Sequence, residues 1–359
     1  MDDLKLIIMD NFKEVGDKII DNLGEECKVD FKTIRFSNGE GKANIDSTIR
    51  EKDVYIISDV GNYGITYKMH GKNQRMSPDD HFQDIKRVIA SMSGQARELT
   101  VVMPMLYESR QHRKKPKESL DCALALRELE NLGVDRIITI DCHDPDVCNA
   151  IPTLQFENFF PTNEILKEII KNENIDDLLV ISPDQGAIDR TKNFTDILEV
   201  ETGIFSKRRD TSRVVNGKNP IIEHVYMGPP VNGKNIIVVD DMIASGGSML
   251  DVGRMLKEQG ANEVILVSTF SLFTEGINKF DIAKKAEIFD KVYTTNLTYI
   301  PEEYKEREWF KVVDCSDKLS NIIKTIHEHK SIKPLKNGKK EILELINKKK
   351  EKTKELSLI

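Results

Sequence analysis

The most informative stretch of the chain is residues 235–252, NIIVVDDMIASGGSMLDV. It begins with an apolar run rich in β-branched residues, which ends in the acidic pair Asp240 and Asp241. A glycine-rich turn follows, and an amphipathic segment begins directly after it. A short apolar run that leads through a tight turn into a helical pattern is typical of a βα unit in a parallel sheet. The stretch therefore predicts an α/β fold with a ligand-binding turn at the carboxyl end of this strand.

Short apolar runs alternate with longer amphipathic segments along the rest of the chain, which indicates further βα units and a mostly parallel sheet. We expect helices over 118–132 and 248–258, because each segment is followed by a glycine that can end a helix, Gly133 or Gly260. The segments that we expect to form strands are 54–58, 99–104, 136–140, 178–182, 236–240, 264–269 and 291–294.

Two parts of the chain are weakly similar to each other. DVYIISDV at 53–60 aligns with NIIVVDDM at 235–242, and QARELTVV at 95–102 aligns with GANEVILV at 260–267. Such matches predict a duplicated α/β unit. The first copy has a longer polar segment, residues 61–80, where the second copy has its short turn. We therefore expect the ligand-binding turn in the second copy.

Length, composition and charge limit the class of protein. A chain of 359 residues with 39% hydrophobic content is expected to form two ordinary domains rather than one oversized core. The net charge is -7 with both signs interspersed, so an anionic ligand must be held by a local site. The sequence begins without a basic segment and a following apolar run, and no stretch approaches the roughly 18 apolar residues of a membrane span. We therefore expect a cytoplasmic protein that binds neither nucleic acid nor membrane.

The glycine-rich turn after the acidic pair has the chemistry of a phosphate site. Glycines let the backbone approach a bound group, so successive N–H groups, serine hydroxyls and a helix N-terminus can surround a phosphate. Adjacent carboxylates can accept hydrogen bonds from sugar hydroxyls or support hydrated magnesium. An N-capped turn without a ligand is the structural alternative, and the absence of GxxxxGK(S/T) argues against a P-loop nucleotide hydrolase. The residues of this candidate site are Asp240, Asp241, Ser245, Gly246, Gly247 and Ser248.

The turn resembles the phosphoribosyl pyrophosphate signature of the phosphoribosyltransferase fold, and the rest of the chain resembles the ribose-phosphate pyrophosphokinase family. The resemblance implies two similar phosphoribosyltransferase-type, Rossmann-like domains with mostly parallel sheets, plus a C-terminal helical tail. The motifs that carry it, in order along the chain, are RFSNGEGKANIDSTIREKDVYII (35–57), VVMPMLYESRQHRK (101–114), ITIDCH (138–143), VISPDQGA (180–187), SKRR (206–209) and the signature at 236–248.

The resemblance and a change in composition suggest how the chain is divided. Residues 1–157 are expected to form an N-terminal α/β domain with the ATP-side motifs, and residues 158–314 a C-terminal α/β domain with the phosphoribosyl-binding loop. Residues 315–332 are expected to form a helix that packs back on the N-terminal domain. Residues 333–359 are rich in lysine and carry apolar residues at helical spacing, among them Ile342. They predict a solvated helical tail, with a partner-binding or phosphate-attracting arm as the alternative.

One group of residues matches the positions at which the family holds the adenine of ATP. These are Phe36, Asn38 and Glu40, and in the family they commonly act from a neighbouring subunit. An aromatic face can stack on a base, and polar side chains can bond its exocyclic amine. Taken alone, Phe36 would be read as a core residue. Asn38 departs from the family, which usually has an aspartate there.

A second group matches the positions at which the family contacts phosphates and metal. Arg110, Gln111 and His143 fall on ATP-contact positions, and guanidinium donors suit phosphate oxygens. His143 and Asp184 fall on positions used at Mg²⁺, the expected cofactor. As isolated residues, the histidine and the aspartate would be read as structural. His112 replaces the aspartate that is common in this stretch.

Lys207 and Arg209 match positions of catalytic importance in the family, although a lone basic run would be read as a solvated loop. The resemblance implies transfer of a diphosphoryl group from ATP to ribose 5-phosphate, in a dimer-based homo-oligomer for which a hexamer is one candidate form. Ala244 departs from the family, which usually has an aspartate there that contacts the ribose-phosphate substrate. The insert between Val60 and Asp80 has no counterpart in the common short form.

Two other functions remain as alternatives. A catalytically silent member of the same family could bind a nucleotide or regulate a partner, but the basic residues of the motifs argue against it. A phosphoribosyltransferase that acts on a nucleobase would not need the ATP-side motifs at 36–40 and 110–113.

Overall fold

The computed structural model describes residues 3–114, 116–209 and 221–357, and within this part the side chains of 207–209, 221–224 and 352–357 are left out. The chain forms two compact units. We call them the N-terminal unit (1–161, 296–301 and 314–336) and the C-terminal unit (162–295, 302–313 and 337–359). Residues 296–301 thus belong by their contacts to the N-terminal unit, although the sequence placed them in the second domain.

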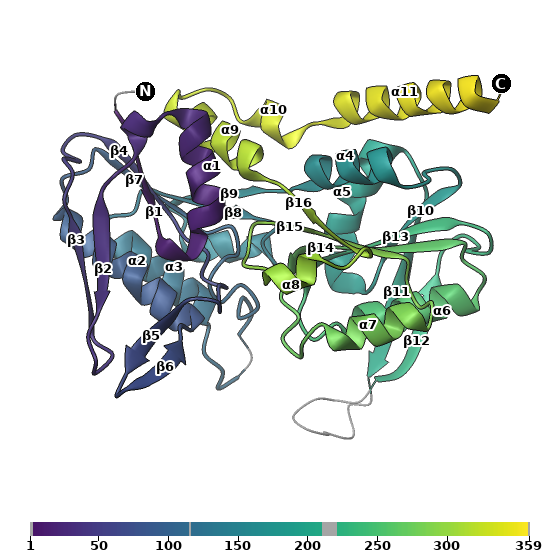
Figure 1. Cartoon of the computed structure of the whole chain (residues 1–359), viewed down its shortest axis with the longest axis horizontal. Helices are drawn as coiled ribbons and strands as arrows, with labels where there is room; N and C mark the ends of the chain where they lie inside the picture. Colours follow the sequence, from purple (N-terminus) through teal and green to yellow (C-terminus); the bar gives the residue numbers. More distant parts are fainter. Residues whose placement is uncertain (1–2, 115, 210–220, 358–359) are drawn as a thin grey trace. The chain divides into compact units, whose positions relative to one another are not determined.

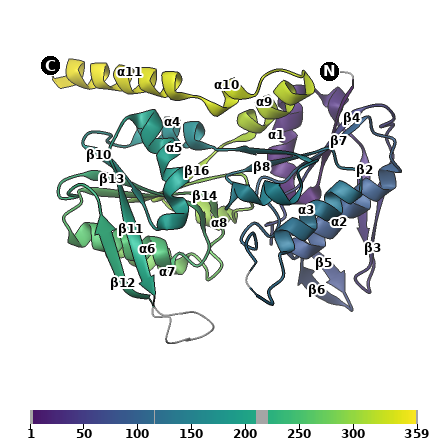
Figure 2. The same cartoon turned by 180° about the vertical axis from the view of Figure 1, so that it is seen from behind.

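The N-terminal unit is built on a parallel sheet with the strand order β1-β4-β7-β8-β9. Two antiparallel hairpins, β2–β3 and β5–β6, stand outside this sheet (Figures 1 and 2). Its strands are β1 (Leu4–Ile8), β2 (Phe31–Arg35), β3 (Gly41–Ile45), β4 (Asp53–Ile57), β5 (Thr66–Met69), β6 (Lys72–Arg75), β7 (Glu98–Val102), β8 (Arg136–Ile140) and β9 (Gln155–Phe159). Its α-helices are α1 (Lys13–Leu23), α2 (Pro78–Met92), α3 (Asp121–Asn131), α9 (Ser316–His327) and α10 (Lys333–Lys336), and its 3-10 turns are η1 (Asp10–Phe12), η2 (Glu25–Cys27) and η3 (Pro145–Ala150).

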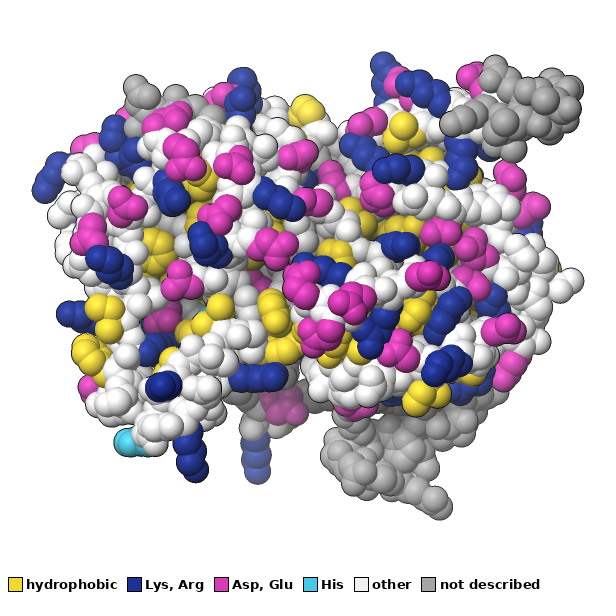
Figure 3. Space-filling view, viewed as in Figure 1, with side chains coloured by type: hydrophobic (Ala, Val, Ile, Leu, Met, Phe, Trp, Pro, Cys, Tyr) yellow, Lys and Arg dark blue, Asp and Glu magenta, His cyan; other side chains and the backbone are white. Residues whose placement is uncertain are grey.

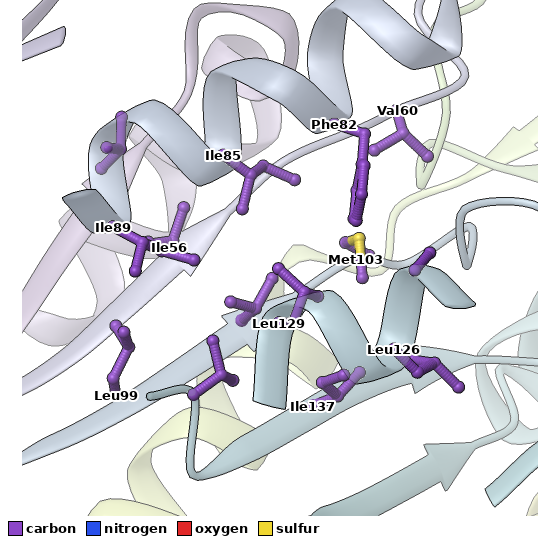
Figure 4. Close-up of a cluster of buried hydrophobic side chains, with 14 of the residues drawn as sticks. Ile56, Val60, Phe82, Ile85, Ile89, Leu99, Met103, Leu126, Leu129 and Ile137 are labelled. Carbon is purple, nitrogen blue, oxygen red and sulfur yellow. The ribbon is translucent and has the colours of Figure 1, made fainter. Parts of the chain in front are cut away.

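Helices α2 and α3 bury their apolar side chains against one face of this sheet. Figure 4 shows Phe82 of α2 directed toward Met103, just after β7, and Ile89 of α2 beside Ile56 of β4. All five residues of β4 are buried, as expected for a central strand of a parallel sheet that is covered on both faces. Helix α9 packs against α1, so residues 314–336 return to the N-terminal unit.

The C-terminal unit has a seven-stranded sheet with the order β12-β11-β10-β13-β14-β15-β16. Only the pairing of β12 with β11 is antiparallel among the described strands of this sheet. Helices α4 and α5 lie on one face of the sheet, and α6 and α7 lie on the other (Figures 1 and 2). Its strands are β10 (Leu178–Ser182), β11 (Thr202–Arg209), β12 (Ile221–Met227), β13 (Asn235–Ile243), β14 (Glu263–Ser271), β15 (Lys291–Thr295) and β16 (Phe310–Val313). Its helices are α4 (Thr162–Asn172), η4 (Gln185–Ala187), α5 (Ile188–Leu198), α6 (Gly247–Glu258), α7 (Asn278–Lys285), α8 (Glu302–Lys305) and α11 (Lys339–Ser357).

The mostly parallel α/β architecture is confirmed in both units. Every strand expected from the sequence is present, and β8 and β10 have the expected bounds. Helices α3 and α6 begin within three residues of the expected positions, and Gly133 and Gly260 follow them with positive φ angles of 87° and 86°. The strands that the sequence did not predict are β1, β2, β3, β5, β6, β9, β11, β12 and β16.

The predicted internal duplication is visible in the register of the two sheets. The residue of β7 opposite Asp53 of β4 and the residue of β14 opposite Asn235 of β13 are both glutamates, at aligned positions. Arg97 Nε donates to Asp53 Oδ1 at 2.8 Å, and Asn262 Nδ2 donates to Asn235 Oδ1 at 2.7 Å. Since these four residues also align in sequence, each unit repeats the same strand pair and the same hydrogen bond at its base.

The lysine-rich tail is helical, but the prediction that it is a solvated appendage is wrong for its first half. Helix α11 packs along α4 and α5, and Ile342 is fully buried. Lys349 Nζ donates to the carbonyl oxygens of Ile170 and Glu173 at the C-terminal end of α4. Lys339 pairs with Glu199 at 2.7 Å. The apolar positions therefore belong to the C-terminal unit's packing, and several lysines act as helix-end and ion-pair partners.

The surface carries mixed charge. Acidic and basic side chains are interspersed over the face that Figure 3 shows. None of the helices in the described residues has the length and apolar character needed to cross a membrane.

Candidate functional site

The glycine-rich turn lies between β13 and α6 in the C-terminal unit. Gly246 occupies the N-cap of α6 with φ 78°, a conformation that favours glycine. A Cβ added there would lie 2.3 Å from the ring of buried Phe280, so no side chain fits at this position. At Gly247, by contrast, a Cβ would meet only the Lys279 amine, at 3.6 Å. The Phe280 ring thus packs against Gly246, whereas the space beside Gly247 is bordered by the Lys279 amine.

Lys279 is a basic residue beside the turn that the sequence did not single out. It lies in the first turn of α7, and its Nζ is 3.4 Å from the Ser245 carbonyl oxygen and 3.6 Å from a carboxylate oxygen of Glu275. A single lysine in a helical segment carries no signal in the sequence. Its position adds a positive charge to a turn whose backbone N–H groups and helix N-terminus already favour an anion.

The acidic pair lies within β13, two residues before its end, and is buried with an arginine. Asp241 is almost fully buried, and the side chain of Asp240 is 21% exposed. Arg190 of α5 places Nη1 at 3.7 Å from Asp240 Oδ1 and Nη2 at 4.0 Å from Asp241 Oδ2. Burial and the neighbouring Asp241 raise the pKa of Asp240 well above its ordinary value, whereas Arg190 opposes the rise. Because a carboxylate in this position gains from any added positive charge or donor, the pair is suited to bind hydroxyls or a cation.

Arg190 was missed by the sequence analysis, although a signal for it exists. The buried positions of α5 are Arg190, Thr191, Phe194 and Leu198, which form one face of the helix. An arginine on the apolar face of a helix is rarely buried without an anionic partner. Together with the acidic pair after a nearby strand, it could have predicted a buried charge cluster.

Asp184 lies at the carboxyl end of β10, which is the neighbour of β13 in the sheet. Its Oδ1 accepts a hydrogen bond from Gly186 N at 2.9 Å, and Ser182 Oγ donates to its carbonyl oxygen at 2.6 Å. The carboxylate is also close enough to Asp240 to contribute to the raised pKa of that residue. The structure therefore brings Asp184, Asp240 and Asp241 together in the C-terminal unit, at the edge where parallel sheets bind ligands.

The second ATP-side group lies in the N-terminal unit, after strands β7 and β8. Arg110 and Gln111 are exposed in the segment that follows β7. His143 follows β8, and its ring centroid is 5.2 Å from that of His112. His112 Nε2 lies 3.1 Å from Asp144 Oδ2. His112, which replaces the aspartate common in the family, thus lies beside His143 and pairs with Asp144.

The proposed metal positions lie in different units, His143 in the N-terminal and Asp184 in the C-terminal one. Among the residues that the structure describes, no group of three or more His, Cys, Asp and Glu side chains is arranged as a metal site. Lys207 and Arg209 lie in β11, but their side chains are outside the described part of the chain. The roles of these four residues remain predictions from the resemblance.

Phe36, Asn38 and Glu40 are brought together by the tight turn between β2 and β3. Phe36 N donates to Glu40 O at 2.8 Å and closes the turn. Asn38 Nδ2 donates to Glu40 Oε2 at 3.0 Å, and Asn38 Oδ1 accepts from Glu40 N at 3.1 Å. Phe36 is 45% exposed, so it is not the core residue that it would be taken for in isolation. The turn presents an aromatic ring and a bonded amide–carboxylate pair at the surface.

Known proteins resemble this chain over most of its length. A family model described as the N-terminal domain of ribose phosphate pyrophosphokinase matches residues 4–133, and one described as a phosphoribosyl transferase domain matches residues 157–306. The ribose-phosphate pyrophosphokinase of Bacillus subtilis (strain 168) is 27% identical over 345 residues, which cover 92% of this chain and 96% of the relative. Ribose-phosphate pyrophosphokinase 1 of Streptococcus pneumoniae serotype 4 is 29% identical over 363 residues, which cover 95% and 99%.

A solved structure shows the same architecture. The phosphoribosylpyrophosphate synthetase of Mycobacterium smegmatis matches with a TM-score of 0.75 and 22% identity, covering 91% of this chain and 99% of that one. The predicted fold, two similar phosphoribosyltransferase-type domains with a C-terminal helical tail, is therefore confirmed.

Proposed function

Because the chain belongs to the ribose-phosphate pyrophosphokinase family, we propose that it transfers the diphosphoryl group of Mg-ATP to the C1 hydroxyl of ribose 5-phosphate. The products are phosphoribosyl pyrophosphate and AMP. The observation that carries the proposal is the strand end at which a buried acidic pair, an arginine and a glycine turn meet. This arrangement offers acceptors for ribose hydroxyls directly beside donors for a phosphate.

In this reaction the oxygen of the C1 hydroxyl attacks the β-phosphorus in line. The bond from that phosphorus to the α,β-bridging oxygen breaks, AMP leaves with the oxygen, and the hydroxyl proton passes to water. The protein mainly aligns the substrates and stabilises charge. We assign the ribose hydroxyls to Asp240 and Asp241, and the 5-phosphate to Ser245, Gly246, Gly247 and Ser248.

Lys279 is an addition to this phosphate site. Ala244 leaves the turn without the carboxylate that the family usually has there, and a methyl group accepts no hydrogen bond. The nearby amine of Lys279 supplies a positive charge beside the same turn. The chain is thus expected to hold the 5-phosphate with backbone donors and a lysine, and with one acidic contact fewer to the sugar.

The donor nucleotide is assigned to the N-terminal unit, with Phe36, Asn38 and Glu40 at the adenine. The phosphate-side residues of this assignment are Arg110, Gln111 and His143, and Lys207 and Arg209 stabilise the group in transfer.

Mg²⁺ is the proposed cofactor, and His143 and Asp184 are the residues assigned to it. The acidic surroundings of Asp184, which raise the pKa of Asp240, fit a divalent cation. Such a cation, when bound, neutralises phosphate oxygens. The proposal further includes a cytoplasmic, dimer-based or hexameric homo-oligomer whose partners are ATP and ribose 5-phosphate.

The test is to incubate purified protein with ribose 5-phosphate and Mg-ATP and to quantify AMP and phosphoribosyl pyrophosphate together by anion-exchange chromatography. We expect the two products in equal amounts, and none when EDTA removes Mg²⁺. Asp240→Asn should lower formation of both by a factor on the order of a hundred, because a substrate acceptor is lost. Asp251→Asn is the matched control, since Asp251 lies on α6 with a half-exposed side chain that pairs with Arg254.

Two results would contradict the proposal. Binding of both substrates without product would indicate a catalytically silent family member. Formation of a nucleotide from phosphoribosyl pyrophosphate and a nucleobase, without use of ATP, would indicate a phosphoribosyltransferase.

A further inference from the structure

The insert between Val60 and Asp80 forms a hairpin of its own in the N-terminal unit. Strands β5 and β6 pair with Met69 opposite Lys72, and His70 and Gly71 form the two-residue turn with φ angles of 47° and 78°. Two successive positive φ angles are typical of the tight turn that fits the twist of a hairpin. The polar segment is therefore an ordered element rather than an irregular loop.

The tip of this hairpin contacts the β2–β3 turn that carries Phe36. His70 N donates to Ser37 O at 2.8 Å. Met69 Sδ lies so near Gly39 that a Cβ there would be 2.9 Å from the sulfur, and Gly39 has a φ of 94°. In Figures 1 and 2 the β5–β6 hairpin is seen beside the end of β2–β3. Two turns that are separate in sequence thus pack tip to tip.

The hairpin is also fixed to the rest of the unit along its length. The guanidinium of Arg35, at the end of β2, lies 5.4 Å from the centre of the Tyr67 ring. Arg35 in turn bonds Asp84 of α2 at 2.9 Å. At the base of the hairpin, Arg75 lies 5.4 Å from the centre of the Tyr63 ring. The insert therefore connects the β2–β3 turn to α2 and to its own base.

The strands of the β2–β3 hairpin are anchored to the rest of the unit, but its turn is exposed. Strand β3 packs on α2, and Phe31, Ala43 and Ile45 lie against the hydrophobic core, whereas residues 36–38 are exposed. The hydrogen bond from His70 and the contact with Met69 therefore add to the turn's own hydrogen bonds in holding Phe36 and Glu40.

From these contacts we propose that the β5–β6 hairpin is a positioning element, with Met69 and His70 as its contact residues, that holds the β2–β3 turn ready for the adenine of the donor nucleotide. The inference rests on the proposed function for the identity of the ligand. A turn that is already ordered loses less conformational entropy on binding, so the insert should increase affinity for ATP without touching the acceptor sugar.

The experiment compares Met69→Ala with Asn73→Ala, an exposed residue of β6 on the same hairpin. For Met69→Ala we expect KM for Mg-ATP to rise roughly three- to tenfold, with kcat and KM for ribose 5-phosphate within about twofold of wild type. Asn73→Ala should leave all three constants unchanged. Replacement of residues 66–75 by a short glycine-serine linker should give a larger rise in KM for Mg-ATP.

Two further measurements separate positioning from other effects. Amide hydrogen exchange at residues 36–40 in nucleotide-free protein should become faster in Met69→Ala and not in Asn73→Ala. Light scattering should give the same mass for all proteins. Faster exchange with an unchanged KM for Mg-ATP, unchanged exchange, or a smaller assembly in Met69→Ala would each overturn the proposal.

A failure of the proposed function can be distinguished from a failure of the positioning role. If the wild type makes no phosphoribosyl pyrophosphate, titration calorimetry with a non-hydrolysable ATP analogue replaces KM. Weaker binding by Met69→Ala than by Asn73→Ala would then support the positioning role in a silent family member. Absence of nucleotide binding by the wild type would overturn it.

Discussion

Arg190 and the two aspartates of β13 form a charge cluster that the C-terminal unit has to bury. The arginine is 6% exposed and lies within about 4 Å of both carboxylates. Removing one partner of a buried ion pair leaves an uncompensated charge, which costs more than the pair contributes. Single residues of this kind connect folding and substrate binding, because the same carboxylates are proposed to hold the ribose.

We expect Arg190→Met to lower the free energy of unfolding by about 3 kcal/mol, measured by urea denaturation. It should also raise KM for ribose 5-phosphate, since Asp240 would then be more readily protonated. Arg254→Met is the matched control, because the Arg254 side chain is 51% exposed, and it should change stability by less than about 0.5 kcal/mol. Equal stability of the two variants would show that Arg190 does not compensate the acidic pair.

Asp59 of the N-terminal unit predicts a dependence of stability on pH. Burial raises its pKa from 3.8 to about 7, although Tyr299, Gly61 and Thr298 donate hydrogen bonds that oppose the rise. Because the folded protein binds this proton more tightly than the unfolded chain, the stabilisation is complete below about pH 4. It is lost as the pH rises through 7.

The wild type should therefore lose about 3 kcal/mol more of its free energy of unfolding than Asp59→Asn between about pH 5 and 8. Urea denaturation at several pH values measures the difference. The amide of the Asp59→Asn variant loses a hydrogen bond at every pH. The two proteins are therefore compared only by how steeply the free energy of unfolding changes with pH. Parallel slopes for the two proteins would mean that Asp59 is ionised in the folded state at low pH. Asp46→Asn, at an exposed position just after β3, should follow the wild type.

At the scale of elements, α11 shows how the tail is tied to the fold. Its first half packs on α4 and α5 through Ile342, and Lys349 bonds the end of α4. Lys349 gives the carbonyl oxygens at the end of α4 a hydrogen-bond donor in place of water, and Ile342 covers apolar side chains of α4 and α5. The tail is thus expected to stabilise the C-terminal unit and not only to increase solubility.

Ile342→Ala should lower the free energy of unfolding by about 2–4 kcal/mol, because a fully buried side chain leaves a cavity. Ile282→Ala on α7 is the control, since that side chain is 70% exposed, and its effect should stay below about 0.5 kcal/mol. Chemical denaturation followed by far-UV circular dichroism measures both. An Ile342→Ala variant as stable as the control would mean that α11 is detached in solution.

At the scale of the whole molecule, the exposed Phe36 raises the question of which copy of the chain it serves. Its ring is 45% exposed on a turn at the surface of the N-terminal unit. An exposed aromatic residue with a binding role can complete the site of a second copy in a symmetric assembly. The family resemblance implies this arrangement, and complementation between two inactive variants can test it.

Phe36→Ala and Asp240→Asn should each be nearly inactive, and refolding them together in equal amounts should restore activity. If Phe36 acts on a neighbouring copy, each mixed dimer contains one intact site, and about a quarter of wild-type activity returns. Refolding each variant alone is the control. No recovery in the mixture, with mixed dimers demonstrated by differently tagged chains, would place Phe36 and Asp240 in the same copy.

The local apolar pattern was sufficient to place the central strands, and the glycine-rich signature was sufficient to place the turn between β13 and α6. β8 and β10 have the predicted bounds because a short continuous apolar run is typical of a strand that is buried on both faces of a parallel sheet. Gly246 was expected from the glycine-rich signature, and its φ of 78° in the structure is a conformation that favours glycine. These features depend on interactions within a few residues, which a sequence displays directly.

Other features depended on contacts between distant parts of the chain. The β5–β6 hairpin is mostly polar, with Tyr67 and Met69 half-buried on one face of β5. Its order comes from contacts with Ser37, Gly39 and Arg35, about thirty residues earlier. Burial of Arg190 depends on an acidic pair fifty residues later, and burial of Ile342 on helices near the middle of the chain. The sequence by itself thus determined the βα repeat and the position of the glycine-rich turn. Only the tertiary structure decided which polar segments are ordered and which charges are buried. The free energies of packing, hydrogen bonding and ion pairing that decide this arise between residues that the chain brings together only when it folds.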